Sequence, residues 1–89
     1  MYAVHLSRRA QKDLLGIPKK DARRIRAALT DLAAEQNPQA SVKKLKGHEQ
    51  VPVYSCRIGT YRVILTIDNG IFVIFVITID NRGSEYRNI

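Results

Sequence analysis

The sequence predicts an α+β domain, in which a helical hairpin packs on one face of a small, mainly antiparallel four-stranded sheet in the order β-α-α-β-β-β. Two observations carry this prediction. Apolar residues recur with a helical period in the first half of the chain, and three strand-like segments separated by turn dipeptides fill the second half. Because 89 residues suffice for one small domain, we treat residues 1–89 as a single domain.

The first half contains one strand and two helices. Alternation over residues 2–6 predicts a short strand, Ser7 offers a helix N-cap, and Gly16 closes the first helix. Pro18 fits the first turn of the second helix, which ends before Pro38. The apolar stripe of this second helix consists of Ala22, Ile25, Leu29 and Leu32.

The second half begins with a basic linker, "QASVKKLKGHEQ", and continues as three strands. We expect these strands at residues 51–58, 61–67 and 71–79. Asn69-Gly70 is a strong signal for a two-residue hairpin turn, and Gly59-Thr60 suits a two-residue turn with glycine first.

Two-residue turns fix which residues lie opposite one another. The first hairpin then pairs Ile58 with Tyr61, Arg57 with Arg62, Cys56 with Val63, Ser55 with Ile64 and Tyr54 with Leu65. The second hairpin pairs Ile67 with Phe72, Leu65 with Ile74, Val63 with Val76 and Arg62 with Ile77. Alternation places Cys56 on the apolar face that meets the helices, so we expect a core cysteine and not a nucleophile.

The charge balance indicates a polyanionic partner. The net charge is +7, and the whole excess lies in residues 1–47, which hold eleven basic and four acidic residues. The longest apolar run, residues 71–77, is far shorter than the ~20 residues of a membrane span, and no signal peptide is visible. We therefore expect a cytoplasmic protein without a membrane partner. The single cysteine excludes an intramolecular disulfide and a cysteine zinc site.

The second sheet face carries two features that need an explanation. Arg57 and Arg62 lie opposite one another, and this repulsion is relieved either internally, by a carboxylate such as Asp80 or Glu85, or externally, by a phosphodiester. The same face also has an apolar patch that the helices leave uncovered. Such a patch indicates either a protein partner or burial by a segment of this chain that is predicted to lie elsewhere. The residues of this patch are Ile64, Val73, Phe75 and Ile77.

Four segments in order span nearly the whole chain: "YAVHLSRRAQKDLLGIPKKDARRI", "VKKLKG", "RIGTYRVILTID" and "NRGSEYR". Together they resemble the RelE/ParE superfamily of bacterial and archaeal toxins of toxin-antitoxin systems, and its RelE branch in particular. The resemblance implies the RelE-like microbial RNase fold, and an endoribonuclease that cuts mRNA in the ribosomal A site without a metal or other cofactor. It also implies a cognate antitoxin, expected to be a small acidic RelB-like protein.

The resemblance also implies roles for single residues. Arg62 of "TYRV" and Arg82 of "NRGSEY" match catalytic arginines, and Tyr86 matches a tyrosine that contacts a base. We expect further contacts to RNA phosphates from Arg57, Lys43, Lys44, Lys46 and Arg87.

The sequence departs from its relatives at possible proton-transfer positions. Some relatives carry lysines where this chain has Val53 and Ser55, and others a histidine where it has Asn81, so the general base stays unassigned. Two alternatives follow: an inactive relative that binds antitoxin or RNA, and a ParE-like inhibitor of DNA gyrase. The short helical hairpin weighs against gyrase inhibition.

Overall fold

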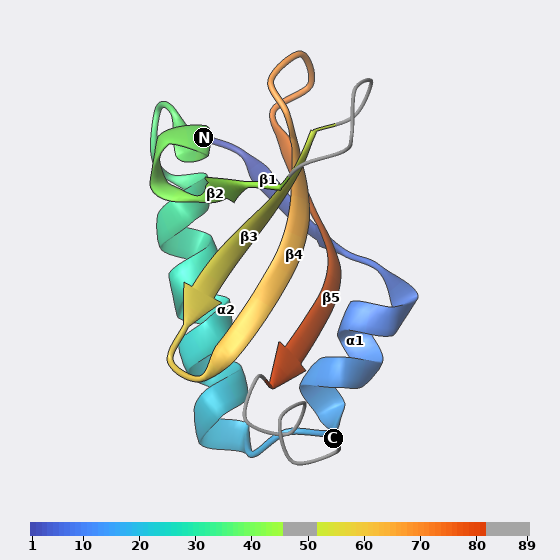
Figure 1. Cartoon of the computed structure of the whole chain (residues 1–89). Coiled ribbons are helices and arrows are strands. Elements are labelled where there is room, and N and C mark those ends of the chain that lie inside the picture. Colours follow the sequence, from blue (N-terminus) through green and yellow to red (C-terminus); the bar gives the residue numbers. More distant parts are fainter. Residues whose placement is uncertain (46–51, 82–89) are drawn as a thin grey trace.

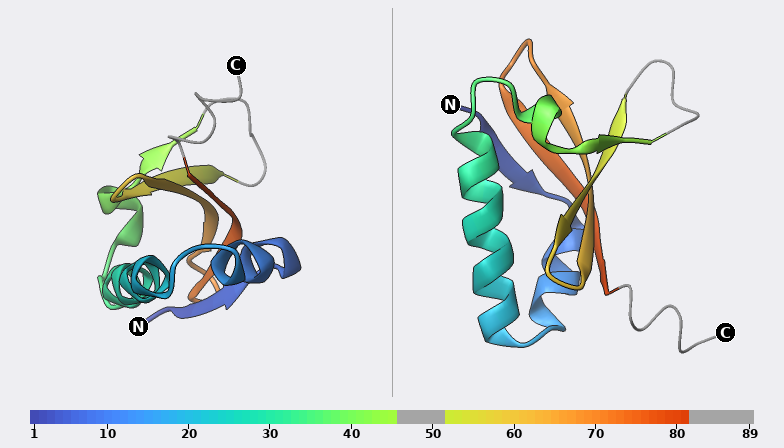
Figure 2. Two further views of the ribbon diagram at one scale, coloured as in Figure 1. Left: turned by 90° about the horizontal axis from the view of Figure 1, so that it is seen from below. Right: turned by 60° about the vertical axis from the view of Figure 1, so that its left-hand side comes forward.

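The structure, a computed structural model, describes residues 1–45 and 52–81. Its elements are β1 (Ala3–Leu6), α1 (Arg8–Leu15), α2 (Lys19–Ala33), the 3₁₀ helix η1 (Pro38–Ser41), β2 (Lys43–Lys44), β3 (Val53–Ile58), β4 (Tyr61–Asp68) and β5 (Val73–Asn81). Figure 1 and Figure 2 show α1 and α2 together on one face of the sheet. The predicted α+β class and the helical hairpin are therefore confirmed. Within the described ranges, neither helix has the length and hydropathy that a membrane-spanning helix needs.

The described part of the sheet has five strands, one more than predicted, in the order β1-β5-β4-β3-β2. β1 runs parallel to β5, and the other neighbouring pairs are antiparallel. The additional strand is β2, where the sequence suggested only a linker: Lys43 pairs with Ser55 and Lys44 with Tyr54. An edge strand presents unpaired backbone groups, and this short segment satisfies some of them on β3.

The ends of both helices follow from local sequence. The Ser7 side chain accepts a hydrogen bond from the Ala10 amide at 2.9 Å, so Ser7 is the predicted N-cap of α1. Gly16 closes α1, because its amide donates to the carbonyls of Lys12 and Asp13. Pro18 is the residue just before α2.

The core lies between the helices and the inner face of β3, β4 and β5. Among the described residues, six apolar side chains in it have no accessible surface: Ala10, Ile25, Val63, Leu65, Ile74 and Val76. Burying one such Val, Leu or Ile side chain contributes about 1.5–3 kcal/mol, so this layer is the main source of stability in a small domain. Cys56 packs against the core, as the alternation predicted.

The first hairpin has the predicted register. Ile58 lies opposite Tyr61 and Arg57 opposite Arg62, as the two-residue turn requires. Gly59 adopts a positive φ of 61°, a conformation that glycine tolerates without strain. A Cβ atom at Gly59 would also lie 3.4 Å from the guanidinium of Arg24, which covers the turn.

The predicted two-residue turn of the second hairpin is wrong. Four residues, 69–72, separate β4 from β5, so Asp68 pairs with Val73 and Ile67 with Ile74. The Asp68 carboxylate accepts hydrogen bonds from the amides of Gly70 at 2.8 Å and Ile71 at 3.2 Å, which stabilises the longer loop.

The loop is also held against the start of β1. The residue with positive φ is Phe72, at 56°, and its ring packs edge to face against Tyr2 with the centroids 5.4 Å apart. The Tyr2 hydroxyl donates to Asn69 at 2.6 Å. These contacts favour the four-residue loop over the tight turn that the dipeptide alone suggested.

A β-bulge changes the register a second time. Leu65 pairs with Val76 but Ile64 pairs with Thr78, so Ile77 is the extra residue. Val76 and Ile79 are three residues apart, and both are buried, with 0% and 4% of their surface exposed. An uninterrupted strand would place them on opposite faces, so the bulge is what allows both to reach the core.

The predicted pairs of Leu65 with Ile74, Val63 with Val76 and Arg62 with Ile77 are therefore corrected. Leu65 pairs with Val76, Val63 with Ile79 and Arg62 with Asp80. The loop accounts for a shift of two residues and the bulge for one more. The end of β5 is thereby placed beside Arg62.

Candidate functional site

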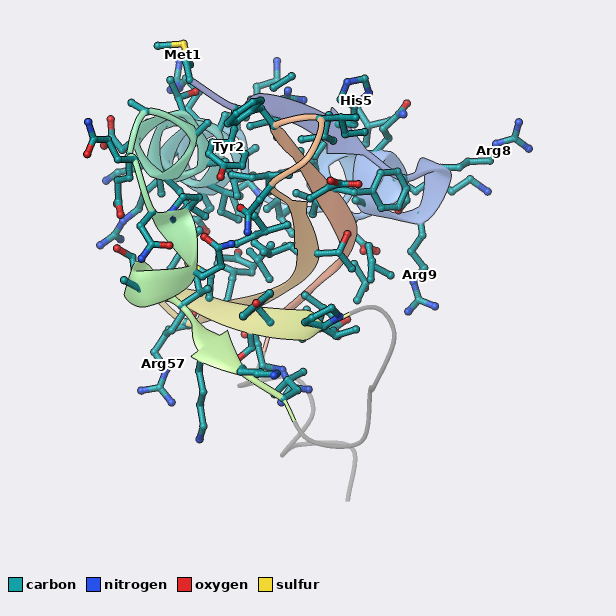
Figure 3. All side chains as sticks on the ribbon, turned by 90° about the horizontal axis from the view of Figure 1, so that it is seen from above. Met1, Tyr2, His5, Arg8, Arg9 and Arg57 are labelled. Carbon is teal, nitrogen blue, oxygen red and sulfur yellow. The ribbon has the colours of Figure 1, made fainter. Side chains whose placement is uncertain are left out.

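The candidate site lies on the outer face of the sheet, which is the face turned away from α1 and α2. Arg57 on β3 and Arg62 on β4 lie directly opposite one another, as predicted. Arg57 is exposed and Arg62 half-buried. Figure 3 shows the Arg57 side chain extending away from the two helices.

A groove of about 640 Å³ runs beside these arginines. It is lined by Ala40, Ser41, Val42, Lys43, Leu45, Ser55, Cys56, Arg57 and Arg62. One wall therefore comes from η1 and β2 and the other from β3 and β4. The groove depends on β2, the strand that the sequence did not predict, because β2 holds Lys43 beside Ser55.

The electrostatics of the groove favour an anion. Three cationic side chains, Lys43, Arg57 and Arg62, line it. Among the described residues at this end of the sheet, Asp80 is the carboxylate placed opposite Arg62. A second described carboxylate, Glu35, accepts a hydrogen bond from Ser41 on the wall of the groove. Two carboxylates balance at most two of these three positive charges, so the described carboxylates account for only part of the charge. Arginine forks also match the geometry of phosphate oxygens.

The other predicted RNA-binding and catalytic residues fall in two groups. Lys44 pairs with Tyr54, so strand alternation places it on the opposite side of β2 from Lys43. The remaining residues of the prediction, Lys46, Arg82, Tyr86 and Arg87, lie outside the described residues. Arg82 follows directly on Asn81, which pairs with Tyr61 next to Arg62.

The predicted apolar patch occupies the part of the sheet beyond the arginines. Phe75 is 41% exposed, whereas Ile64, Val73 and Ile77 are half-buried. Ile77 is the bulge residue, so Ile64 lies opposite Thr78. In Figure 2, α1 and α2 both lie on the opposite face of the sheet. The exposed member of the predicted patch is therefore Phe75, and Thr78, not Phe75, lies opposite Ile64.

Cys56 also borders the groove, and it is a poor nucleophile. Burial, and to a lesser extent the charge of Glu35, raise the pKa of its thiol. The thiolate is the reactive form of cysteine, so a raised pKa lowers its reactivity. Within the described part of the chain, His, Cys, Asp and Glu side chains form no group of three or more that suits a metal ion.

Tyr61 anchors the hairpin that carries the arginines. Its hydroxyl donates to the Asp21 carboxylate on α2 at 2.8 Å, and its side chain is only 7% exposed. Burial, together with the hydrogen bond to Asp21 and its charge, raises the pKa of Tyr61. The neutral phenol is therefore the form that the fold stabilises.

Replacing Tyr61 by phenylalanine is expected to flatten the alkaline part of the stability curve. Since the folded-state pKa of Tyr61 lies above its unfolded value of about 10, its contribution is full below that pH and is lost as pH rises further. Urea unfolding between pH 8 and 11 measures this: wild type loses stability more steeply than Tyr61→Phe above pH ~10. Tyr54→Phe is the matched control, and equal slopes in both variants would contradict the assignment to Tyr61.

Comparisons with known proteins agree with this fold. The family model described as "ParE toxin of type II toxin-antitoxin system, parDE" matches residues 4–86. A chain of the archaeal RelE-RelB complex from Pyrococcus horikoshii OT3 is 31% identical, with a TM-score of 0.76 over 92% of this chain and 96% of that one. A chain of the RelBE2 toxin-antitoxin complex from Mycobacterium tuberculosis is 28% identical, with a TM-score of 0.67 over 91% and 98%.

The isolated RelE toxin of E. coli has the same fold at lower identity. It is 17% identical, with a TM-score of 0.73 and full coverage of both chains. A search among curated protein sequences found no significant match.

The helical hairpin on a mixed sheet, with a basic groove on its open face, defines a RelE-like domain. The chain belongs to the RelE/ParE superfamily of type II toxin-antitoxin toxins, within its RelE-like branch.

Proposed function

We propose that this toxin is a ribosome-dependent endoribonuclease that cleaves mRNA in the ribosomal A site and so inhibits translation. The observation that carries the proposal is the opposed pair Arg57 and Arg62 in a groove that also contains Lys43. Three cations that line one groove suit a phosphodiester backbone.

The proposed reaction is an attack of a ribose 2′-hydroxyl on the adjacent phosphorus. The 2′-oxygen forms a bond to phosphorus and gives up its proton, and the bond from phosphorus to the 5′-oxygen breaks. The leaving 5′-oxygen takes up a proton, so the products are a 2′,3′-cyclic phosphate and a 5′-hydroxyl. Negative charge builds up on the phosphorane oxygens, and fixed guanidinium groups stabilise it.

In this proposal Arg62 is the described residue that stabilises the phosphorane. Its half-buried position lets packing hold the guanidinium in place, whereas the exposed Arg57 and Lys43 bind flanking phosphates. Lys44 and Lys46 are assigned to phosphates of ribosomal RNA.

Three further assignments rest on the resemblance alone, since they fall outside the described residues. Arg82 would be the second catalytic arginine and Tyr86 the ring that contacts a base. Arg87 would contact a further phosphate. Asn81, the last described residue of β5, pairs with Tyr61, the chain neighbour of Arg62.

We also propose that a RelB-like antitoxin is the partner that inhibits this toxin. Of the three similar structures named above, two come from RelE-RelB or RelBE2 complexes. An acidic partner would complement the basic groove, and the patch around the exposed Phe75 offers an apolar contact on the same face. A complex in which the partner touches neither the groove nor Phe75 would contradict this assignment.

Primer extension on a defined mRNA in a reconstituted translation reaction tests the proposed activity. We expect cuts at codon-spaced positions that appear only when ribosomes are present. Naked mRNA with the same toxin concentration is the control. Cuts of equal strength on naked mRNA would contradict the ribosome dependence.

DNA gyrase inhibition is the second candidate, because the matching family model is that of ParE toxins. Trapped gyrase-DNA complexes with intact mRNA in the same cells would favour it. Intact mRNA and intact gyrase activity would instead favour the remaining alternative, that the protein is an inactive relative that binds antitoxin or RNA.

A further inference from the structure

One edge of β5 pairs with β1 over its first half and is bonded by Ser7 and Asp13 over its second half. β1 pairs with β5 up to Leu6, which lies opposite Val76. Beyond Val76, the residues at the start of α1 form the hydrogen bonds to this edge of β5. The Ser7 amide donates to the Val76 carbonyl at 2.9 Å, and the Ser7 hydroxyl donates to the Ile77 carbonyl at 2.6 Å. The N-cap of α1 therefore also binds the bulge residue.

Asp13 binds the residues that follow the bulge. One carboxylate oxygen, Oδ2, accepts hydrogen bonds from the Ile79 amide at 2.9 Å and from the Thr78 hydroxyl at 3.1 Å. Asp13 is half-buried, and the neighbouring Ala10 and Leu14 of α1 are buried in the core. The carboxylate thus substitutes for a neighbouring strand at this edge of the sheet.

The bulge decides which residue faces Arg62. If β5 continued from the Leu65–Val76 pair without the extra residue, Ile79 would lie opposite Arg62 and Asp80 opposite Tyr61. With the bulge, Asp80 lies opposite Arg62 and Asn81 opposite Tyr61. The residues that surround Arg62 on the outer face therefore depend on contacts made on the far edge of β5.

We propose that Asp13 is a positioning residue for the catalytic arginine Arg62. Asp13 fixes the bulged register of β5, and this register places Asp80 opposite Arg62 and Asn81 opposite Tyr61. Asp13 belongs to the helical layer and Arg62 to the open face, so Asp13 acts through β5 and does not touch the RNA. The inference rests on the proposed endoribonuclease function.

Steady-state cleavage of ribosome-bound mRNA by three variants tests this role. Asp13→Ala removes the acceptor and is expected to lower kcat about ten- to hundredfold with KM unchanged, since small misplacements of a catalytic group cost that much. Asp13→Asn keeps a carbonyl that accepts from the Ile79 amide, and it is expected to stay within about threefold of wild type. Asp31→Ala removes an exposed carboxylate of α2 and controls for the change in charge.

Amide hydrogen exchange and NMR give a readout that needs no activity. In Asp13→Ala the Ile79 amide is expected to exchange at least about tenfold faster, and the Arg62 side-chain resonance to shift, while Asp13→Asn and Asp31→Ala keep wild-type values. Thr78→Val keeps the side-chain volume and removes one of the two hydrogen bonds. It should move both signals in the same direction by a smaller amount, which keeps the test decisive if Asp13→Ala does not fold.

The outcomes separate this inference from the proposed function. Wild-type Ile79 exchange and an unmoved Arg62 signal in Asp13→Ala would overturn the positioning role, as would a drop in Asp13→Asn as large as in Asp13→Ala. A changed KM with unchanged kcat would also overturn it. If wild type cleaves no mRNA, the proposed function fails, and the link from Asp13 to Arg62 is then decided by the NMR readout alone.

Discussion

Replacing Arg62 by alanine is expected to lower the rate of mRNA cleavage by about 10²–10³-fold, the cost of removing one preorganised donor to a developing oxyanion. Arg62 is half-buried between Arg57 and Asp80 in the register of β3, β4 and β5, so its guanidinium is held before the substrate binds. Single-turnover cleavage of ribosome-bound mRNA measures the rate. Arg62→Lys is expected to recover only part of it, because lysine keeps the charge but lacks the planar fork.

Two arginines provide controls for the Arg62 variants. Arg57→Ala removes an exposed phosphate contact and is expected to weaken binding more than it slows cleavage. Arg23→Ala removes an equal charge from an exposed site on α2 and is expected to leave the cleavage rate near wild type. If Arg23→Ala and Arg62→Ala slow cleavage equally, net charge and not a positioned guanidinium determines the rate.

Replacing Leu65 by alanine is expected to lower the free energy of unfolding by about 3–5 kcal/mol. Leu65 is 0% exposed in the central strand β4, where it pairs with Tyr54 on one side and Val76 on the other. Since small domains have about 5–15 kcal/mol of total stability, the variant is expected to lie near its unfolding midpoint at 37 °C. Urea titration followed by circular dichroism gives the free energy.

The matched control is Leu15→Ala, at the last residue of α1. The Leu15 side chain is 85% exposed, so the same chemical change is expected to cost less than about 0.5 kcal/mol. Equal losses in the two variants would mean that burial in the sheet does not determine the effect.

The first hairpin was predictable because one residue determines its geometry. Gly59 takes the positive φ that a two-residue turn needs, and the register of β3 and β4, including the Arg57–Arg62 pair, follows from it. The opposed arginines of the candidate site were thus available from the sequence.

The second hairpin was not predictable from its turn dipeptide. The side chain of Asp68 binds two amides of the loop, and Phe72 packs on Tyr2, a residue far away in the sequence. Such contacts depend on the tertiary structure, which overrides a local preference for Asn-Gly. The bulge did leave a signal, since Val76 and Ile79 are both strongly apolar at a spacing that a regular strand cannot bury on one side.

The wall of the groove and the role of Asp13 also required the structure. β2 spans only Lys43–Lys44, which is too short to produce an alternating pattern. Asp13 resembles any polar residue of an amphipathic helix, and its partners, Thr78 and Ile79, are more than sixty residues away. The role of Asp13 could not be assigned without knowing which strand α1 lies beside.

The parallel pairing of β1 with β5 bears on when the toxin can form during synthesis. Ala3 pairs with Val73, so β1 cannot pair with β5 until about seventy further residues have been translated. Non-local pairing of this kind slows folding, and the strand that completes it also brings Asp80 beside Arg62. A nascent chain that has not yet reached β5 lacks the strand that pairs with both β1 and β4, so neither the closed core nor the pairing of Arg62 with Asp80 can form until β5 has been synthesised.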